Sequence, residues 1–392
     1  MRKTTALLAA LTLLSSLSPL SLRADPGVTD HEIKFGSCVP LSGGNKINGI
    51  GYSNGAKAYF AYLNAEKGGV NGRKIVLDLK DDGYDVDKAI ACYKELLADG
   101  VFATGLAIGT PTGAKYVLLA ENNKVPFIAN AGGPSFMAEP LKKYVFAVRT
   151  TYAQEINVGV QHVWKDLGLH RIGVIYQNDA LGAAVLDGLR KALEPLGGSI
   201  VAEGAYPRNT TDIEAGYNAV RAANPDVVYI GGVTVPMGAI LKKAKEDGWK
   251  PLFVPVPARD KELMKVAGAA TEGIVIGNAI PLESEEKLPT AALFRRVMKK
   301  YLPEAEPSGL SFLGFVDAMV LTEGLKRAGK DLTRDGLVAA METMSDLDVG
   351  LGPEFHVTYG PKDHEAFHTV AFSTIKSGKV IPIKSWRSDL GR

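Results

Sequence analysis

The feature that most constrains the fold of this chain is a regular alternation of short apolar strands with amphipathic helices. It begins near residue 32 and restarts near residue 150. Such alternation predicts βαβ units, in which helices cover both faces of a parallel sheet. The predicted strands cover 32–40, 74–79, 102–108 and 125–129 in the first half, and 171–176, 199–203, 227–231, 252–256 and 273–276 in the second.

The restart of this pattern predicts two similar lobes. The chain has 392 residues, more than one compact domain usually holds, and 46% of them are apolar, enough for two buried cores. Halves of about 120 residues each match two doubly wound α/β lobes. The last part of the chain, 367–386, returns to a strand pattern around a turn at Lys376-Ser377-Gly378-Lys379.

The first 24 residues have the pattern of a signal peptide. Arg2 and Lys3 precede an uncharged apolar stretch, and Ala24 offers a small residue for cleavage. Serines and a proline interrupt the apolar stretch, which makes it a poor membrane span, although a retained anchor is the alternative. We therefore expect cleavage near Ala24 and an exported mature chain that is not embedded in a membrane.

The charge and cysteine content narrow the possible functions. A net charge of +2 without any basic block argues against nucleic acid as a partner. Export would permit a disulfide between Cys38 and Cys92, the only cysteines. Two buried, reduced cysteines fit the sequence equally well.

The motif most typical of an enzyme is His364-Glu365-Ala366-Phe367-His368, which matches the H-E-x-x-H pattern of zinc peptidases. That chemistry needs a helix, whereas this motif follows a turn-like run and leads into a strand-like one. In an extended chain, positions four apart are separated by about 13 Å, too far to share one zinc ion. We therefore predict no metal, no cofactor and no catalytic site, and keep a zinc hydrolase as a minor alternative.

Two loops at neighbouring strand ends favour a binding site. Gly109-Thr110-Pro111-Thr112 follows one predicted strand, with Thr110 as a helix N-cap and Pro111 as the first helical residue. Ala129 to Ser135 follows the next, and Pro134 there could open a second helix. Helix starts at the carboxyl edge of a parallel sheet present free N–H groups, which suit a carboxylate. Ordinary helix capping is the alternative.

Several stretches resemble the branched-chain amino acid-binding family of periplasmic receptors over nearly the whole mature chain. This resemblance implies a type I periplasmic binding protein, with two lobes that close on a ligand and three crossings near Arg149, Gly277 and Phe367. We accordingly expect lobe 1 at 25–149 plus 278–367 and lobe 2 at 150–277 plus 368–392. The matching stretches are 36–43, 64–75 with Asp81-Asp82, 125–128, 148–151 and 226–232.

The resemblance also implies a set of pocket residues. The positions that hold the ligand carboxylate in the family fall on Gly109, Thr110, Thr112, Ala131, Gly132 and Gly133. The other predicted pocket residues are Asn48, Tyr152, Leu181, Val233, Thr234, Arg259, Asp260 and Phe312. For Tyr152 and Phe312, burial in the core is the alternative.

Departures from the family pattern bear on the ligand. Pro257 occupies the position of the family's ammonium-binding carboxylate, and Leu181 with Val233 or Thr234 replaces two aromatic side chains. A buried ammonium without an anion is costly. Either Asp260 supplies the charge, or the ligand is an acid without an amine, and an aromatic acid remains open.

The resemblance implies a receptor for a small carboxylate, in the periplasm, which serves the permease of an ABC importer as a monomer. A ligand-sensing receptor or regulator of the same fold is the alternative. Ligand identity, permease and oligomeric state are not determined by the sequence.

Overall fold

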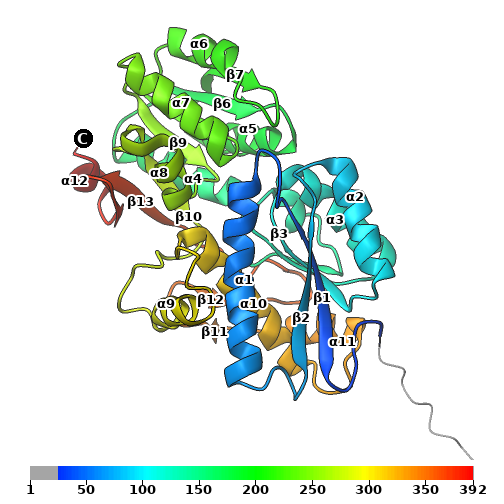
Figure 1. Ribbon diagram of the computed structural model, residues 1–392. Coiled ribbons are helices and arrows are strands. Elements are labelled where there is room, and N and C mark those ends of the chain that lie inside the picture. Colours follow the sequence, from blue (N-terminus) through cyan, green and yellow to red (C-terminus); the bar gives the residue numbers. More distant parts are fainter. Residues whose placement is uncertain (1–24, 392) are drawn as a thin grey trace, which may run out of the picture.

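The computed structural model of the protein describes residues 25–391, and the predicted signal peptide lies outside them. Two lobes are visible in Figure 1, one built largely from the blue, cyan and orange parts of the chain and the other from the green part. None of the helices in the described part of the chain is long and apolar enough to cross a membrane. The predicted fold class, α/β with two parallel-sheet lobes, is confirmed.

Lobe 1 is built on a five-stranded parallel sheet with the order β2-β1-β3-β4-β5. Its strands are β1 (Glu32–Val39), β2 (Lys74–Asp81), β3 (Ala103–Ala107), β4 (Phe127–Asn130) and β5 (Val145–Phe146). Its helices are α1 (Lys46–Glu66), α2 (Val86–Ala98), α3 (Thr110–Asn123), α9 (Pro289–Tyr301), α10 (Gly309–Arg327) and α11 (Arg334–Met341), with a small sheet of β11 (Leu347–Asp348) and β12 (His356–Val357).

A segment from late in the sequence completes this lobe. Helix α10 lies along α1, as Figure 1 shows, and its Phe312 and Phe315 pack in the same core as Tyr59. Helix α10 is apolar nearly all round and almost wholly buried, as expected for a helix inside a core. A disulfide joins Cys38 in β1 to Cys92 in α2. Of the two possibilities that the sequence left open, a disulfide or two reduced cysteines, the structure has the disulfide.

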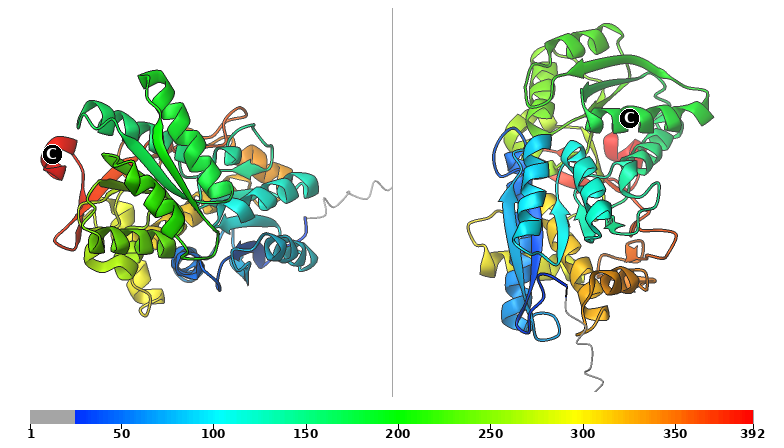
Figure 2. Two further views of the ribbon diagram at one scale, coloured as in Figure 1. Left: turned by 90° about the horizontal axis from the view of Figure 1, so that it is seen from above. Right: turned by 90° about the vertical axis from the view of Figure 1, so that its right-hand side faces the viewer.

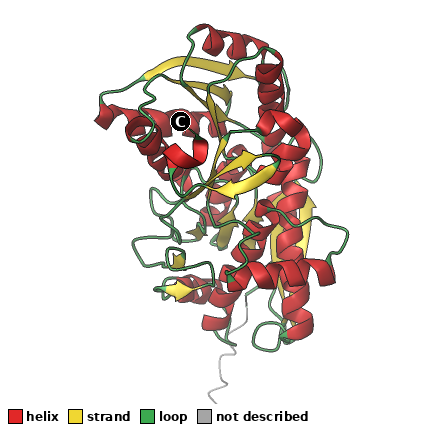
Figure 3. Cartoon of the chain, turned by 90° about the vertical axis from the view of Figure 1, so that its left-hand side faces the viewer, coloured by secondary structure: helices red, strands yellow, loops and turns green. Residues whose placement is uncertain are grey.

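Lobe 2 repeats the architecture with a four-stranded parallel sheet in the order β7-β6-β8-β9. Two views in Figure 2 show helices on both sides of this sheet, and Figure 3 shows the helices, strands and loops of both lobes. Its strands are β6 (Ile172–Gln177), β7 (Ile200–Tyr206), β8 (Val227–Gly231) and β9 (Leu252–Val256). Its helices are α4 (Tyr152–Lys165), α5 (Ala180–Leu193), α6 (Glu214–Ala222), α7 (Thr234–Glu246) and α8 (Asp260–Ala267).

The predicted strand at 273–276 does not continue the parallel sheet. It forms β10 (Val275–Asn278), which pairs antiparallel with β13 (Ala371–Lys376), and β13 pairs with β14 (Lys379–Pro382). The turn between β13 and β14 has positive φ at Ser377 and Gly378, as two-residue hairpins require. A short helix, α12 (Trp386–Leu390), ends the described chain.

Three connecting segments lie between the lobes, after β5, after β10 and before β13, and hydrogen bonds tie them together. The backbone N–H of Thr151 donates to Glu365 Oε1 at 2.9 Å, and Asn278 Nδ2 donates to Ser373 Oγ at 2.9 Å. The predicted crossings near 149, 277 and 367 fall in or beside these segments. The assignment of each residue to one lobe stays a prediction.

Candidate ligand-binding site

A small cavity lies between the carboxyl edges of the two parallel sheets. The space open to the centre of a water molecule is about 20 Å³, which is room for little more than one water. A ligand of several non-hydrogen atoms therefore requires the lobes to move apart. The cavity is lined by Asn45, Asn48, Tyr84, Ile108, Gly109, Thr110, Ala131, Gly132, Tyr152, Leu181, Gly232, Val233, Pro257 and Arg259.

Most of the residues that the sequence predicts for the pocket come together here. Asn48, Gly109, Thr110, Ala131, Gly132, Tyr152, Leu181, Val233 and Arg259 all line the cavity. The remaining predicted residues, Thr112, Gly133, Thr234, Asp260 and Phe312, lie elsewhere.

The start of α3 forms one wall of the cavity from lobe 1. Gly109 is the N-cap, with a φ of 138°, and no side chain caps the helix. The expectation that Thr110 caps this helix is therefore wrong by one position, because Gly109 adopts the non-helical conformation there. The Thr110 hydroxyl is buried and lies 3.5 Å from the Tyr152 hydroxyl, at the cavity wall.

Asn130, at the end of β4, fixes the second loop against the first. Its Oδ1 accepts from the backbone N–H of Gly132 at 3.1 Å, and its Nδ2 donates to the Gly109 carbonyl at 3.2 Å. The expected second helix is only a 3₁₀ turn, Ser135–Met137, so this loop offers no extended helix start. A side chain at Gly133 would clash with Thr150 and Arg149, so this glycine serves packing.

Lobe 2 supplies apolar side chains and a contact across the cavity. Leu181 in the first turn of α5, Val233 at the N-cap of α7 and Pro257 after β9 face the space between the lobes. Thr234 does not line the cavity. Its hydroxyl donates to Asn48 Oδ1 at 2.8 Å, which joins α7 of lobe 2 to α1 of lobe 1.

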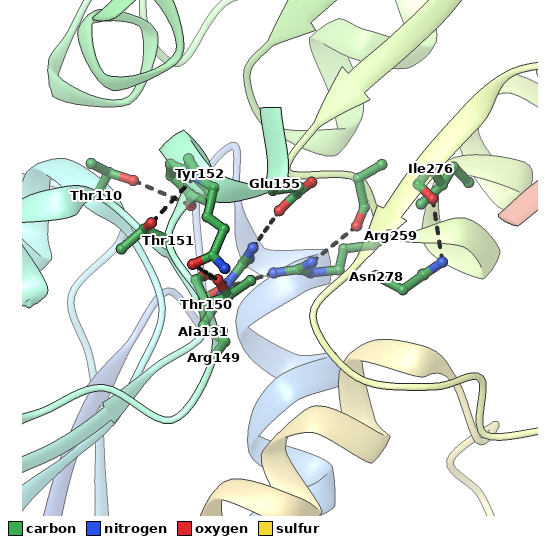
Figure 4. Close-up of polar contacts among 12 residues, drawn as sticks. Thr110, Ala131, Arg149, Thr150, Thr151, Tyr152, Glu155, Arg259, Ile276 and Asn278 are labelled. Atoms are coloured by element: carbon green, nitrogen blue, oxygen red, sulfur yellow. Dashed lines mark hydrogen bonds and ion pairs between the residues drawn. The ribbon is translucent and has the colours of Figure 1, made fainter. Parts of the chain in front are cut away.

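Two arginines approach the same backbone carbonyl beside the cavity. Arg149 Nη1 donates to the Ala131 carbonyl at 3.2 Å, and Arg259 Nη2 donates to it at 2.9 Å, as Figure 4 shows. Arg149 also forms a short, buried ion pair with Glu155. Burial raises the pKa of Glu155, and the positive charge of Arg149 opposes that rise. Arg149 is thus neutralised within the protein.

Arg259 is the one charged residue among those that line the cavity. Its Nη1 also donates a hydrogen bond to the carbonyl of Ala258 at 2.9 Å. Burial lowers the pKa of this guanidinium, and nearby Arg149 lowers it further, but arginine keeps its charge in proteins. Arg259 therefore gives the wall of the cavity a positive charge.

Asp260 does not line this cavity. It adjoins Arg259 in sequence but lines two other hollows, one with Leu310 and one with Glu283. Its Oδ1 accepts a hydrogen bond from the backbone N–H of Lys261 at 2.6 Å. Burial first, and the charges of Glu283 and Glu262 next, raise its pKa to about 7. No aspartate or glutamate of residues 25–391 lines the cavity.

Phe312 belongs to the core of lobe 1, where its ring centroid lies 5.0 Å from that of Phe294. The core alternative is therefore the correct one for Phe312, because α10 turns that side chain inward. Thr112 lies in the first turn of α3 behind Gly109, and its buried hydroxyl has no partner within the described chain.

Sequence reasoning missed Tyr84, which lines the cavity from the loop after β2. Its backbone N–H donates to Asp82 Oδ1 at 2.8 Å, and Asp82 Oδ2 accepts from Tyr116 at 2.6 Å. Burial raises the pKa of Asp82 to about 6. The rule that ligands bind at the carboxyl ends of strands could have pointed to this residue, because Tyr84 lies shortly after β2, which ends at Asp81.

The histidines of the H-E-x-x-H motif face different surroundings. His364 is buried, stacks on Phe146, and has its Nδ1 2.9 Å from the Val145 carbonyl. The exposed His368 pairs with Asp363 at 3.0 Å. Within residues 25–391, no three His, Cys, Asp or Glu side chains lie together as metal ligands would.

Comparison with known proteins agrees with this architecture. A family model described as "Periplasmic binding protein" matches residues 32–379. Leu/Ile/Val-binding protein homolog 3 of Brucella melitensis is 23% identical over 344 residues, which are 87% of this chain and 92% of that relative.

Two solved structures are similar over most of the chain. A possible leucine/isoleucine/valine-binding protein from Rhodopirellula baltica has 26% identity and a TM-score of 0.85, over 90% of this chain and 96% of that one. A substrate-binding periplasmic protein from Ralstonia solanacearum has 26% identity and a TM-score of 0.84, over 90% and 100%. The chain therefore belongs to the periplasmic binding protein family, a family of solute-binding proteins, and is similar within it to Leu/Ile/Val-binding proteins.

Proposed function

We propose that this protein is the periplasmic solute receptor of an ABC importer, and that it captures a small carboxylic acid without an amino group between its lobes. The observation that carries the ligand class is the charge of the cavity, because Arg259 lines it and no carboxylate side chain of residues 25–391 does. A protonated amine in this cavity would lose its hydration and would lie beside a guanidinium of the same charge. Both effects are unfavourable.

The remaining lining fits the body and the oxygens of such an acid. The backbone at Gly109 and Thr110 begins a 14-residue helix, so its N–H groups and the positive end of its dipole face an anion. Leu181, Val233 and Ile108 offer apolar surface for the rest of the molecule. We infer a binding protein and not an enzyme, since these groups can hold an acid but include no nucleophile beside a base.

The proposal is tested by isothermal titration with matched pairs of acids. Leucine is compared with 4-methyl-2-oxopentanoate, and phenylalanine with phenylpyruvate. We expect each oxo acid that binds to do so at least about tenfold more tightly than its amino acid, which corresponds to about 1.4 kcal/mol. The primary amide of the oxo acid is the control for the carboxylate. Tighter binding of the amino acid, or equal binding of acid and amide, would contradict the proposal.

Capture also requires closure of the lobes. The hydrogen bonds from Thr234 to Asn48 and from Arg259 to Ala131 join opposite lobes in the present conformation. We expect small-angle scattering to show a larger radius of gyration without ligand than at saturation. An unchanged radius would argue against a clamp. Delivery to a permease is checked by uptake of the labelled acid in cells that carry the protein or its Arg259→Met variant.

A further inference from the structure

The lobes also meet outside the cavity, where the start of α8 in lobe 2 contacts the start of α10 in lobe 1. Lys261 Nζ donates to the Pro307 carbonyl at 2.7 Å. The hydroxyl of Ser308, the N-cap of α10, donates to Glu262 Oε1 at 2.6 Å. None of these four residues lines the cavity. The contact therefore joins the lobes in the present conformation without using the ligand site.

Three buried carboxylates gather at this contact. Asp260 and Glu262 lie on α8, Glu283 lies in the segment after β10, and each is at most 5% exposed. Oxygens of Asp260 and Glu283 come within 4 Å of the point where a side chain at Gly309, the first residue of α10, would begin. One buried oxygen of each carboxylate has no partner within residues 25–391. Buried polar atoms are nearly always paired, and a proton on one carboxyl group would supply a donor.

The charges at this contact do not cancel. Lys261 Nζ pairs with Glu283 Oε1 at 2.8 Å, so one paired lysine stands against three carboxylates. The N-terminus of α10 adds only a partial positive charge. The other charged residues that line the two hollows around Asp260 are Arg259, Lys265, Glu306 and Lys379.

These further charges do not neutralise the surplus. The two lysines and Glu306 are exposed, so solvent screens them, and Arg259 is engaged beside the cavity. Burial first, and the charge of Glu283 next, raise the pKa of Asp260 to about 7. Asp260 is therefore the carboxyl group that keeps a proton in this conformation at mildly acidic pH.

Separation of α8 from α10 would change the surroundings of Asp260. The side chain would gain water, which favours its charged form, and its pKa would return toward the ordinary value of 3.8. Between these two pKa values, the closed conformation binds more protons than the open one. Proton binding and closure of the lobes are then linked.

Resting on the proposed closure of the lobes, we propose that the contact between α8 and α10 is a proton-dependent latch, in which protonation of Asp260 favours the closed conformation. Because closing takes up a proton, lowering the pH from about 7 toward 4 favours closure by up to about tenfold per pH unit. Above about pH 7 the effect is constant, because Asp260 is then ionised in both conformations. Ligand capture is accordingly tighter at acidic pH, whichever acid binds.

The test is small-angle scattering of the ligand-free protein at about pH 5.5 and about pH 8. We expect the wild type to have the smaller radius of gyration at pH 5.5, with an equilibrium constant for closing about tenfold larger than at pH 8. Asp260→Asn should stay compact at both pH values. Its amide oxygen can still accept from the Lys261 backbone, and its side chain carries no charge at either pH.

Glu306→Gln is the matched control. It removes an exposed carboxylate that pairs with Lys265 at the same contact, and it should keep the pH difference of the wild type. Thermal unfolding at pH 8 checks that both variants fold.

An equal radius of gyration of the wild type at the two pH values would overturn the latch. A difference that survives Asp260→Asn would also overturn it, and would assign the effect to another group, such as His364. Both results leave the proposed function intact, because the choice between oxo acids and amino acids does not depend on this contact. Preference for leucine over its oxo acid would instead contradict the proposed function and leave the latch standing.

Discussion

The two lobes contribute different kinds of groups to the cavity. Lobe 1 presents mainly backbone and short side chains, at Gly109, Thr110 and Gly132, and Asn130 fixes both loops by hydrogen bonds inside the lobe. Lobe 2 presents Leu181, Val233 and the long side chain of Arg259. Backbone N–H groups suit any carboxylate, whereas side chains differ with each substitution. Under the proposed function, lobe 1 would provide a general anion site and lobe 2 would determine which acid binds.

The lobes also differ in how they are stabilised. The only cysteines of the protein form the disulfide inside lobe 1, and α9 to α11 return from late in the chain to complete its core. Lobe 2 contains no disulfide and depends on packing, hydrogen bonds and ion pairs such as that between Arg221 and Asp247. Stability and ligand choice should therefore respond to mutations in different places, which the following predictions test.

The largest expected effect concerns the connection between the lobes. Arg149→Met leaves the Glu155 carboxylate buried without its cation, and breaking such a pair costs about 3–5 kcal/mol. Denaturant unfolding measures the loss. The double variant Arg149→Met/Glu155→Leu is the control and should recover much of it, since no charge is then left unpaired. A single variant as stable as the wild type would show that this pair does not hold the hinge.

A second prediction isolates lobe 1. The disulfide closes a loop with a sequence separation of 54, so Cys38→Ser/Cys92→Ser should lower the free energy of unfolding by about 4 kcal/mol. Because neither cysteine lies at the cavity, the dissociation constant for the ligand should stay the same. Calorimetry and titration measure the two quantities. A large loss of affinity in a folded variant would mean that the anion site of lobe 1 is not rigid by itself.

A third prediction compares the lobes at the ligand. Arg259→Met removes a charge-assisted hydrogen bond worth about 1.5–3 kcal/mol, so affinity should fall by about tenfold or more. Thr110→Val should weaken binding by about tenfold, and its melting temperature should stay unchanged because the Thr110 side chain does not cap α3. If Thr110→Val lowered stability and kept affinity, the hydroxyl would serve the fold and not the ligand.

The last prediction concerns the pH dependence of stability. The pKa of Asp260 is raised to about 7 from its ordinary value near 3.8, so the folded protein keeps a proton that the unfolded chain releases. Its contribution is present below about pH 4 and is lost as the pH rises toward 7, by at most about 1.4 kcal/mol per pH unit. Asp260→Asn should flatten the profile in that window. An identical profile would mean that Asp260 keeps an ordinary pKa in the folded protein.

The ends of the predicted strands pointed to the candidate site, but the sequence did not show in which direction each side chain points. The alternating pattern and the Gly-Thr-Pro-Thr loop led to Gly109, Thr110, Ala131 and Gly132, because parallel strands bring their carboxyl ends to one edge. The sequence could not separate Arg259 from Asp260, although they are neighbours. In the structure, Arg259 faces the cavity and Asp260 begins α8 on the other side.

By itself, the sequence determined the fold class of this protein: two α/β lobes, with loops at the carboxyl ends of their parallel strands. Those properties follow from local periodicity and from residue identity. The tertiary structure decided that Cys38 meets Cys92, that Phe312 is core, that β10 leaves the parallel sheet, and that Tyr84 lines the cavity. These properties depend on how distant segments pack against each other, and packing between two lobes is not encoded in the period of any single segment.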